Sequence, residues 1–187
     1  MVSKVCKDGH IMEKERYDKR VRIYGDPVLR KKTEAARHDE KGLQKILKLM
    51  NEVIDKTEGV GLAANQVGIS KKIILINLEE YHKLPRFFLL NPEVAFAGES
   101  TDEDEEGCLS VPGVSAPVKR SSEIIVKGGD LNGRQTEIKA DKLLARVLQH
   151  EIDHLNGILF VNRLSEDDFR KLRPVLKELQ KEAKKKK

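Results

Sequence analysis

The chain has 187 residues, of which 39% are hydrophobic and 36% charged, and a formal net charge of +5. This composition, without an apolar N-terminal signal segment, is typical of one water-soluble domain with a sizeable core, and we expect a cytoplasmic protein. It excludes a disulfide-rich scaffold, since the only cysteines are Cys6 and Cys108, and a transmembrane helix, since no apolar run approaches roughly 18 residues.

The first half of the chain predicts two helical segments and two strands. Residues 1–21 are polar and aperiodic, which predicts a loose extension. An aspartate followed by a proline predicts the start of a short helix within 25–30. Apolar residues recur at helical spacing over 39–57 and predict an amphipathic helix. Short apolar runs bounded by turn residues predict strands over 72–78 and 87–91.

The second half predicts a hairpin, two helices and a further strand. The segments 122–129 and 134–140 flank the turn signal Asp-Leu-Asn-Gly and predict the hairpin. A helix is expected over 141–156 with its first residue, Asp141, as cap, followed by a strand or extended segment over 158–164. The last helix begins at Ser165 and carries one apolar stripe. Strands around helices of different character predict a single α+β domain, with small antiparallel or mixed sheets around the helix over 141–156.

The positive charge is concentrated at the C-terminal end. From Arg170 to Lys187 there are nine Lys or Arg residues against two Glu, a balance of +7, which leaves −2 for residues 1–169. Such a segment can bind a polyanion such as RNA. A solvated, frayed tail has the same composition, so charge alone does not decide between them.

The helix over 141–156 contains a motif that can bind a metal ion. The segment QHEIDHLNG (149–157) places His150 and His154 one helical turn apart, so both imidazoles share a face. The helix is apolar on most of its circumference, which predicts a buried element. A divalent ion would satisfy both buried imidazoles, with Glu151 beside them as a general base. The alternative is a pair of surface histidines that merely fit the pattern.

The third ligand has to come from elsewhere, because hydrolytic metal sites usually have three protein ligands. After His154 the chain offers no histidine or cysteine, only carboxylates on or near a charged helix. Upstream, the segment EEGCLSVPG (105–113) contains Cys108, whose thiolate would suit iron(II), zinc, nickel or cobalt. The alternative is that Cys108 is an inert buried thiol.

The segment GVGLAANQVGI (59–69) is suited to the close approach of a substrate backbone. Its glycines and alanines carry almost no side chain, and Gln66 offers an NH2 group that can hold a carbonyl oxygen. Taken alone, the segment is a glycine-rich turn. A nucleotide-binding loop is disfavoured, because no Lys-Ser/Thr pair follows the glycines.

Together these three segments resemble the motifs of peptide deformylases, metal hydrolases that remove the formyl group from newly made proteins. The family motifs G-x-G-x-A-A-x-Q, E-G-C-x-S and Q-H-E-x-D-H-x-x-G are matched by GVGLAANQ (59–66), EGCLS (106–110) and QHEIDHLNG (149–157). They stand in the family's order at similar spacing, and the resemblance covers roughly residues 20 to 180. A lone H-E-x-x-H is a weak signal, whereas the three motifs together are highly specific.

The resemblance implies a role for each motif residue. It assigns three ligands of one divalent ion: Cys108, His150 and His154. The ion is iron(II) in many members, with zinc, nickel or cobalt as substitutes. Water fills the fourth position, and Glu151 handles its proton and later protonates the leaving amine. The Gln66 side chain and the Leu109 backbone N–H hold the oxyanion formed from the formyl group.

The resemblance also implies where the formylated peptide binds. Its methionine side chain enters an apolar pocket, and its main chain lies as an added strand. The residues involved are Val60, Gly61, Gly107, Leu143 and Val147. Asp104 and Ser115 depart from residues often found in the family, which bears on pocket shape and peptide preference but not on the reaction. Arg146 is expected to extend over the pocket rim.

We therefore expect a polar N-terminal extension (1–21), a catalytic domain (22–164) and a C-terminal basic helix with its tail (165–187). The expected substrates are N-formylmethionyl nascent peptides, and the basic helix is a candidate ribosome contact, as in some members of the family. Two rival functions stay open. One is a zinc endopeptidase built on H-E-x-x-H, and the other is a non-catalytic RNA-binding protein with a structural zinc.

Overall fold

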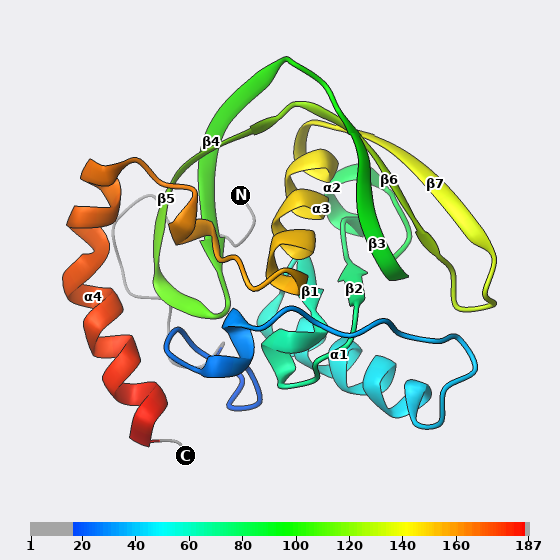
Figure 1. Cartoon of the computed structure of the whole chain (residues 1–187), viewed down its shortest axis with the longest axis horizontal. Coiled ribbons are helices and arrows are strands. Elements are labelled where there is room, and N and C mark those ends of the chain that lie inside the picture. The colour runs from blue at the N-terminus through cyan, green and yellow to red at the C-terminus, as the bar shows by residue number, and fades with distance from the viewer. Residues whose placement is uncertain (1–16, 186–187) are drawn as a thin grey trace.

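The structure is a computed structural model that describes residues 17–185 (Figure 1). Residues 1–16, which include Cys6, and residues 186–187 lie outside the described part. Within it the larger sheet has the strand order β1 (Gly61–Ala63), β2 (Ile73–Ile76), β3 (Phe87–Ala97), β6 (Glu123–Gly129), β7 (Gln135–Asp141), and the smaller sheet pairs β4 (Thr101–Cys108) with β5 (Val111–Ser121). All ladders between these strands are antiparallel, which confirms the α+β prediction.

The helices fill and flank the space between the two sheets. α3 (Lys142–Leu155) lies at the centre and contacts strands of both sheets (Figure 1). α1 (Leu43–Thr57) contacts β1, and α4 (Glu166–Lys185) packs beside β5 on the outside of the smaller sheet. The other helical segments of residues 17–185 are short: η2 (Pro27–Arg30), η3 (Ala64–Val67), α2 (Glu79–His82) and η4 (Phe160–Asn162).

The central position of α3 follows from its apolar residues. Those with 7% exposure or less are Ala145, Val147, Leu148, Ile152 and Leu155. They pack in one core cluster with side chains of β2, β3 and β6. A helix buried in this way can carry polar side chains only where they find partners. The predicted buried helix is confirmed, although the Asp141 side chain makes no cap hydrogen bond at its start.

Two predicted elements differ from the structure in length. α1 begins at Leu43 rather than at Asp39, because Gly42 adopts a left-handed backbone conformation with a φ of 93° and starts the helix there. β3 continues to Ala97, well beyond the predicted end at residue 91, because its second half pairs with β6. Both differences arise from backbone conformation and pairing, which side-chain periodicity does not report.

The strand or extended segment predicted over 158–164 is wrong for the middle of this segment. Its middle forms the 3-10 turn η4, in which the Asn162 side chain accepts a hydrogen bond from the Leu159 N–H at 3.0 Å. Phe160 is buried at 1% exposure in the cluster under α4. The segment is apolar because it packs into the core as a turn, and apolar character alone could not distinguish the turn from a strand.

The hairpin of β4 and β5 is absent from the sequence prediction. β4 begins with the charged run TDEDEE, whose residues are exposed up to Glu105 and buried from Glu106 onward. Such a run resembles a solvated loop. The hairpin matters for the site because β4 ends at Cys108.

Residues 17–21 are packed rather than loose. Val21 is 3% exposed and joins the cluster around α1. Asp18 is also 3% exposed and pairs with Arg20, which reaches Glu52 of α1 at 2.6 Å. The prediction of a loose extension is therefore wrong for this part, and residues 1–16 lie outside the described range.

α4 is held against the domain by its apolar stripe. The Ser165 hydroxyl accepts the Asp168 N–H at 3.1 Å, which confirms the predicted helix start. Leu176 is buried at 3% exposure, and the backbone of Gln180 approaches Gly25 so closely that an added methyl carbon would lie 2.8 Å from it. No helix within residues 17–185 combines the length and apolarity that a bilayer crossing requires.

Candidate metal centre

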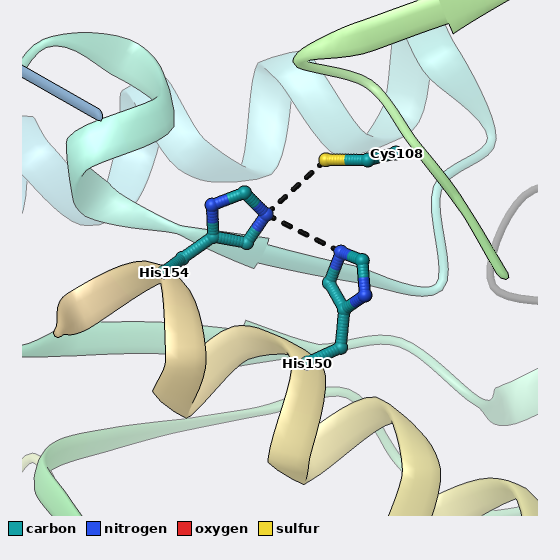
Figure 2. A group of neighbouring side chains, drawn as sticks. All are labelled: Cys108, His150 and His154. Atoms are coloured by element: carbon teal, nitrogen blue, oxygen red, sulfur yellow. Dashed lines mark hydrogen bonds between the residues drawn. The ribbon is translucent and has the colours of Figure 1, made fainter. Parts of the chain in front are cut away.

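Three potential ligand atoms converge at the centre of the fold. The Cys108 thiol, at the end of β4, and two imidazoles of α3 point toward one another (Figure 2). His154 Nε2 lies 3.1 Å from Cys108 Sγ and 3.2 Å from His150 Nε2. All three ligand atoms lie within 4.8 Å of one another, and the three side chains are buried. The structure thus brings together the three residues proposed as ligands from the sequence.

This donor set fits a divalent metal ion. One thiol and two imidazole nitrogens are the ligands found around zinc and related transition ions. Burial lowers the pKa of His154 well below its usual value, so this imidazole is neutral with a free lone pair. Burial also opposes protonation of His150, but its contacts with Cys108 and Glu106 outweigh burial and raise its pKa. A bound cation would displace the proton that these contacts favour.

Glu106 orients His150 from behind. Its Oε2 lies 2.9 Å from His150 Nδ1, which leaves the opposite ring nitrogen directed at Cys108 and His154. Burial alone would raise the pKa of Glu106, but hydrogen bonds from Arg120 and His150 lower it well below its usual range. A carboxylate behind a ligating histidine fixes both the tautomer and the ring orientation.

Glu151 is the buried carboxylate beside this cluster. It is 1% exposed, and burial raises its pKa to about 7. Its Oε2 has no hydrogen-bond partner among residues 17–185. A buried oxygen without a protein partner is costly unless a ligand or water meets it.

The Gln66 side chain points into the site from η3. Its Oε1 accepts the Ala63 N–H at 2.8 Å, which orients the amide. Its Nε2 lies 3.2 Å from Ser110 Oγ and 3.5 Å from Cys108 Sγ. The NH2 group therefore faces the thiol, where it can donate a hydrogen bond to a substrate oxygen.

The residues proposed for peptide binding surround the same region. Val60 and Val147 are buried in one core cluster, and Leu143 packs against it. Gly61 in β1 has no room for a side chain, because an added methyl carbon would lie 2.9 Å from Val147 Cγ1. Gly107 precedes Cys108 in β4. These residues thus come from β4, α3, β1 and the residue just before β1.

Leu109 follows the thiol directly, in the turn between β4 and β5. Its side chain is 9% exposed and packs into the cluster that contains α1. That packing fixes the turn against the body of the domain. The backbone of the turn is therefore anchored next to Cys108.

The two residues that depart from the family pattern, and Arg146, have different surroundings. Asp104 is exposed on β4, where it pairs with Val118, and Ser115 is half-buried opposite Gly107. The expectation that Arg146 extends over a pocket rim is wrong. Its side chain is 2% exposed, and its guanidinium reaches inward to Glu106. The carboxylate and carbonyls of the hairpin attract the charge into the interior.

Sequence reasoning missed the groups that support the ligands. Arg120 donates to both oxygens of Glu106 at 2.9 Å and reaches Asp153 at 2.5 Å. Asn65 donates to the His154 carbonyl at 2.5 Å. Glu106 and Asp153 lie inside the motifs EGC and HEIDH, so their position in the motifs was a usable signal. Arg120 lies in a strand that contains no motif, so the sequence carried no signal of its role.

A buried Cys-His-His cluster, beside a glutamate oxygen that has no hydrogen-bond partner among residues 17–185, is typical of a metal-dependent hydrolase. Comparison with known proteins identifies the family. The pattern described as Polypeptide deformylase matches residues 18–170. The peptide deformylase of Halothermothrix orenii is 46% identical over 144 residues, or 77% of this chain and 92% of that protein. The chain belongs to the polypeptide deformylase family.

Solved structures agree with this membership. The peptide deformylase of Thermus thermophilus has a TM-score of 0.79 at 38% identity, over 87% of this chain and 98% of that one. A Synechococcus elongatus peptide deformylase in complex with actinonin has a TM-score of 0.75 at 36% identity, over 93% of this chain and 91% of that one. The fold and the resemblance stated from the motifs are thereby confirmed.

Proposed function

We propose that Cys108, His150 and His154 hold the ion with which this deformylase works. The enzyme removes the formyl group from the N-terminal methionine of newly synthesised proteins and releases formate, as its family does. The observation that carries the ligand proposal is the convergence of the three buried donor atoms within 4.8 Å. A divalent ion bound there lowers the pKa of water and polarises the formyl carbonyl.

Glu151 is the proposed proton carrier. It lies one residue after His150 on α3 and faces Gly61 of β1, so it adjoins the ligand cluster without belonging to it. Its carboxylate takes a proton from the attacking water and delivers it to the amine that leaves. The lack of a protein partner for Oε2 among residues 17–185 supports this role, because both tasks need an oxygen that no protein group already occupies.

Gln66 and Leu109 are the proposed donors to the oxyanion. The Gln66 amide is oriented by Ala63 so that its NH2 group faces the cluster. The backbone N–H of Leu109 belongs to the residue after Cys108. Donors fixed in advance at a site of developing negative charge often supply a large part of catalysis.

The peptide is proposed to bind along β1. Within residues 17–185, β1 is one of the two edge strands of the larger sheet and has β2 as its strand neighbour. A formylated peptide can pair with the other side of β1 through main-chain groups near Val60, Gly61 and Gly107. Its methionine side chain then lies between Leu143 and Val147.

Formate release from formyl-Met-Ala-Ser tests the assignment. Glu151→Gln should bind metal as the wild type does and lose at least about 100-fold in kcat. Glu105→Gln, an exposed glutamate of β4, is the matched control and should keep full activity. A Glu151→Gln enzyme with wild-type turnover would defeat the proposed mechanism. Cleavage of internal peptide bonds would favour an endopeptidase, and no turnover with RNA binding would favour a structural zinc protein.

We propose iron(II) as the resident ion, with zinc, nickel or cobalt as substitutes. The support is the mixed ligand set of one sulfur and two nitrogens, which suits these ions. Elemental analysis of protein purified without oxygen tests it, and an excess of zinc over iron in that preparation would contradict it.

The cellular setting is part of the proposal. We place the enzyme in the cytoplasm, where nascent peptides carry the formyl group. We propose a division into a polar N-terminal segment (1–21), of which residues 17–21 pack on the domain, a catalytic domain (22–164) and a basic helix with its tail (165–187). The exposed lysines of that helix are proposed to contact ribosomal RNA, which is a dense polyanion.

A further inference from the structure

Arg146 is a buried arginine that joins α3 to the β4–β5 hairpin. It is 2% exposed and lies one helical turn before His150. Its Nη1 donates to Glu106 Oε1 at 2.9 Å and to the Val118 carbonyl at 2.7 Å. Its Nη2 reaches Asp102 Oδ1 at 2.7 Å. One guanidinium therefore contacts both strands of the hairpin, β4 through three of its residues and β5 through Val118.

These contacts connect the two elements that supply the proposed ligands. Cys108 ends β4, whereas His150 and His154 belong to α3. Glu106, two residues before Cys108, contacts His150 through Oε2 and Arg146 through Oε1. The distance from Cys108 Sγ to the imidazole nitrogens thus depends on how the β4–β5 hairpin is fixed against α3.

Charge balance explains why the arginine can be buried there. In the part of the chain that the structure describes, three guanidiniums pair with three carboxylates in one connected group: Arg120, Arg146 and Arg163 with Asp102, Glu106 and Asp153. Removing one member of a buried ion pair leaves the other uncompensated. Each member therefore holds its partners in place.

We propose that Arg146 is a positioning residue that clamps Glu106 and so sets the spacing between Cys108 and His150. The inference rests on the proposed metal site. It gives Arg146 a role in retaining the ion that is separate from any contact with substrate. Because guanidinium contacts are forked and planar, the clamp needs the shape of arginine as well as its charge.

Metal retention by the cobalt(II)-loaded enzyme tests the clamp. The loss of cobalt to a chelator is followed by absorbance in wild type, Arg146→Met and Arg163→Met. Arg146→Met should lose cobalt about 10- to 100-fold faster than wild type, as expected when the partner behind a ligand is disturbed. Arg163→Met removes the same charge from the same group but does not touch Glu106, and should stay within about threefold. If both variants lost cobalt equally faster than wild type, the loss of one positive charge would explain the effect, and the proposal would be overturned.

Arg146→Lys covers the case in which the methionine variant fails to fold. Lysine keeps the charge but cannot reach the strand and the carboxylate together, so cobalt loss should remain faster than in wild type. Wild-type retention in this variant would overturn the clamp. If the wild type itself does not retain cobalt, the proposed metal site fails. If the wild type retains cobalt and Arg146→Met does so equally well, only the role of Arg146 fails.

Discussion

A methyl carbon added to Gly61 would lie 2.5 Å from Glu151 Oε1, so β1 and α3 leave no space for a side chain between them. Gly61→Ala should therefore displace the Glu151 carboxylate and lower kcat/KM about 100-fold while the metal content stays unchanged. Gly98→Ala is the control, because its added carbon would meet the Glu123 carbonyl at an ordinary 3.4 Å. Unchanged kinetics in Gly61→Ala would show that the carboxylate position is not critical.

Gln66→Glu should distinguish the role of the amide oxygen from that of the NH2 group. A carboxylate can still accept the Ala63 N–H, but it cannot donate a hydrogen bond toward Cys108. We expect kcat to fall by about 100- to 1,000-fold, as on removal of one oxyanion donor. Steady-state kinetics on formyl-Met-Ala-Ser measure it. A change confined to KM would assign Gln66 to substrate binding instead.

The Asp18 carboxylate should make folding stability depend on pH. Its hydrogen bond with Arg20 lowers its pKa from 3.8 to about 2. The stabilisation is therefore complete above the unfolded pKa near 3.8 and is lost as the pH falls toward 2. Asp18→Asn should lower the free energy of unfolding by about 1 to 2 kcal/mol at neutral pH and by almost nothing at pH 2. This range allows for the solvent around the half-exposed Arg20.

Urea unfolding at several pH values measures this difference. The control is Asp39→Asn, whose partner Arg37 is 76% exposed, and it should leave stability unchanged at every pH. A constant difference between wild type and Asp18→Asn from pH 7 to pH 2 would contradict the linkage to this carboxylate.

Two adjacent residues of α4 should respond differently to truncation. Leu176 is 3% exposed in the cluster with Leu29 and Phe160, so Leu176→Ala should lower the free energy of unfolding by about 2 to 4 kcal/mol. Val175 is 41% exposed, and Val175→Ala should change it by less than about 0.5 kcal/mol. Similar values for both variants in urea unfolding would show that α4 is not docked through this stripe.

Ribosome association should depend on the exposed lysines of α4. Replacing Lys177, Lys181 and Lys184 by Gln removes positive charge without touching the buried stripe. We expect less enzyme to pellet with ribosomes at low salt, while activity on a short formyl-peptide stays the same. Equal pelleting of both proteins would mean that the helix serves only solubility.

The central helix was predictable because its chemistry and its burial share one pattern. Apolar spacing located α3, and the motif placed His150 and His154 on one face. The edges of the site were harder to predict. The hairpin that carries Cys108 could not be predicted, because β4 begins with exposed charged residues that lack the apolar alternation typical of a strand.

The supporting ion pairs show the limit of sequence reasoning most clearly. Arg120 and Arg146 are far apart along the chain, and both would ordinarily be expected at the surface. They are buried because the fold brings three carboxylates to meet them and Arg163. Only the three-dimensional pairing of hairpin and helix identifies such partners, since no local pattern encodes them.

The proposed binding of the peptide along the edge strand β1 has a consequence for the range of substrates. A strand edge reads amide and carbonyl groups, which are alike in every polypeptide. In this binding mode, selection by side chains beyond the first residue would be weak. One small enzyme would then serve the whole output of translation, whatever each protein goes on to become.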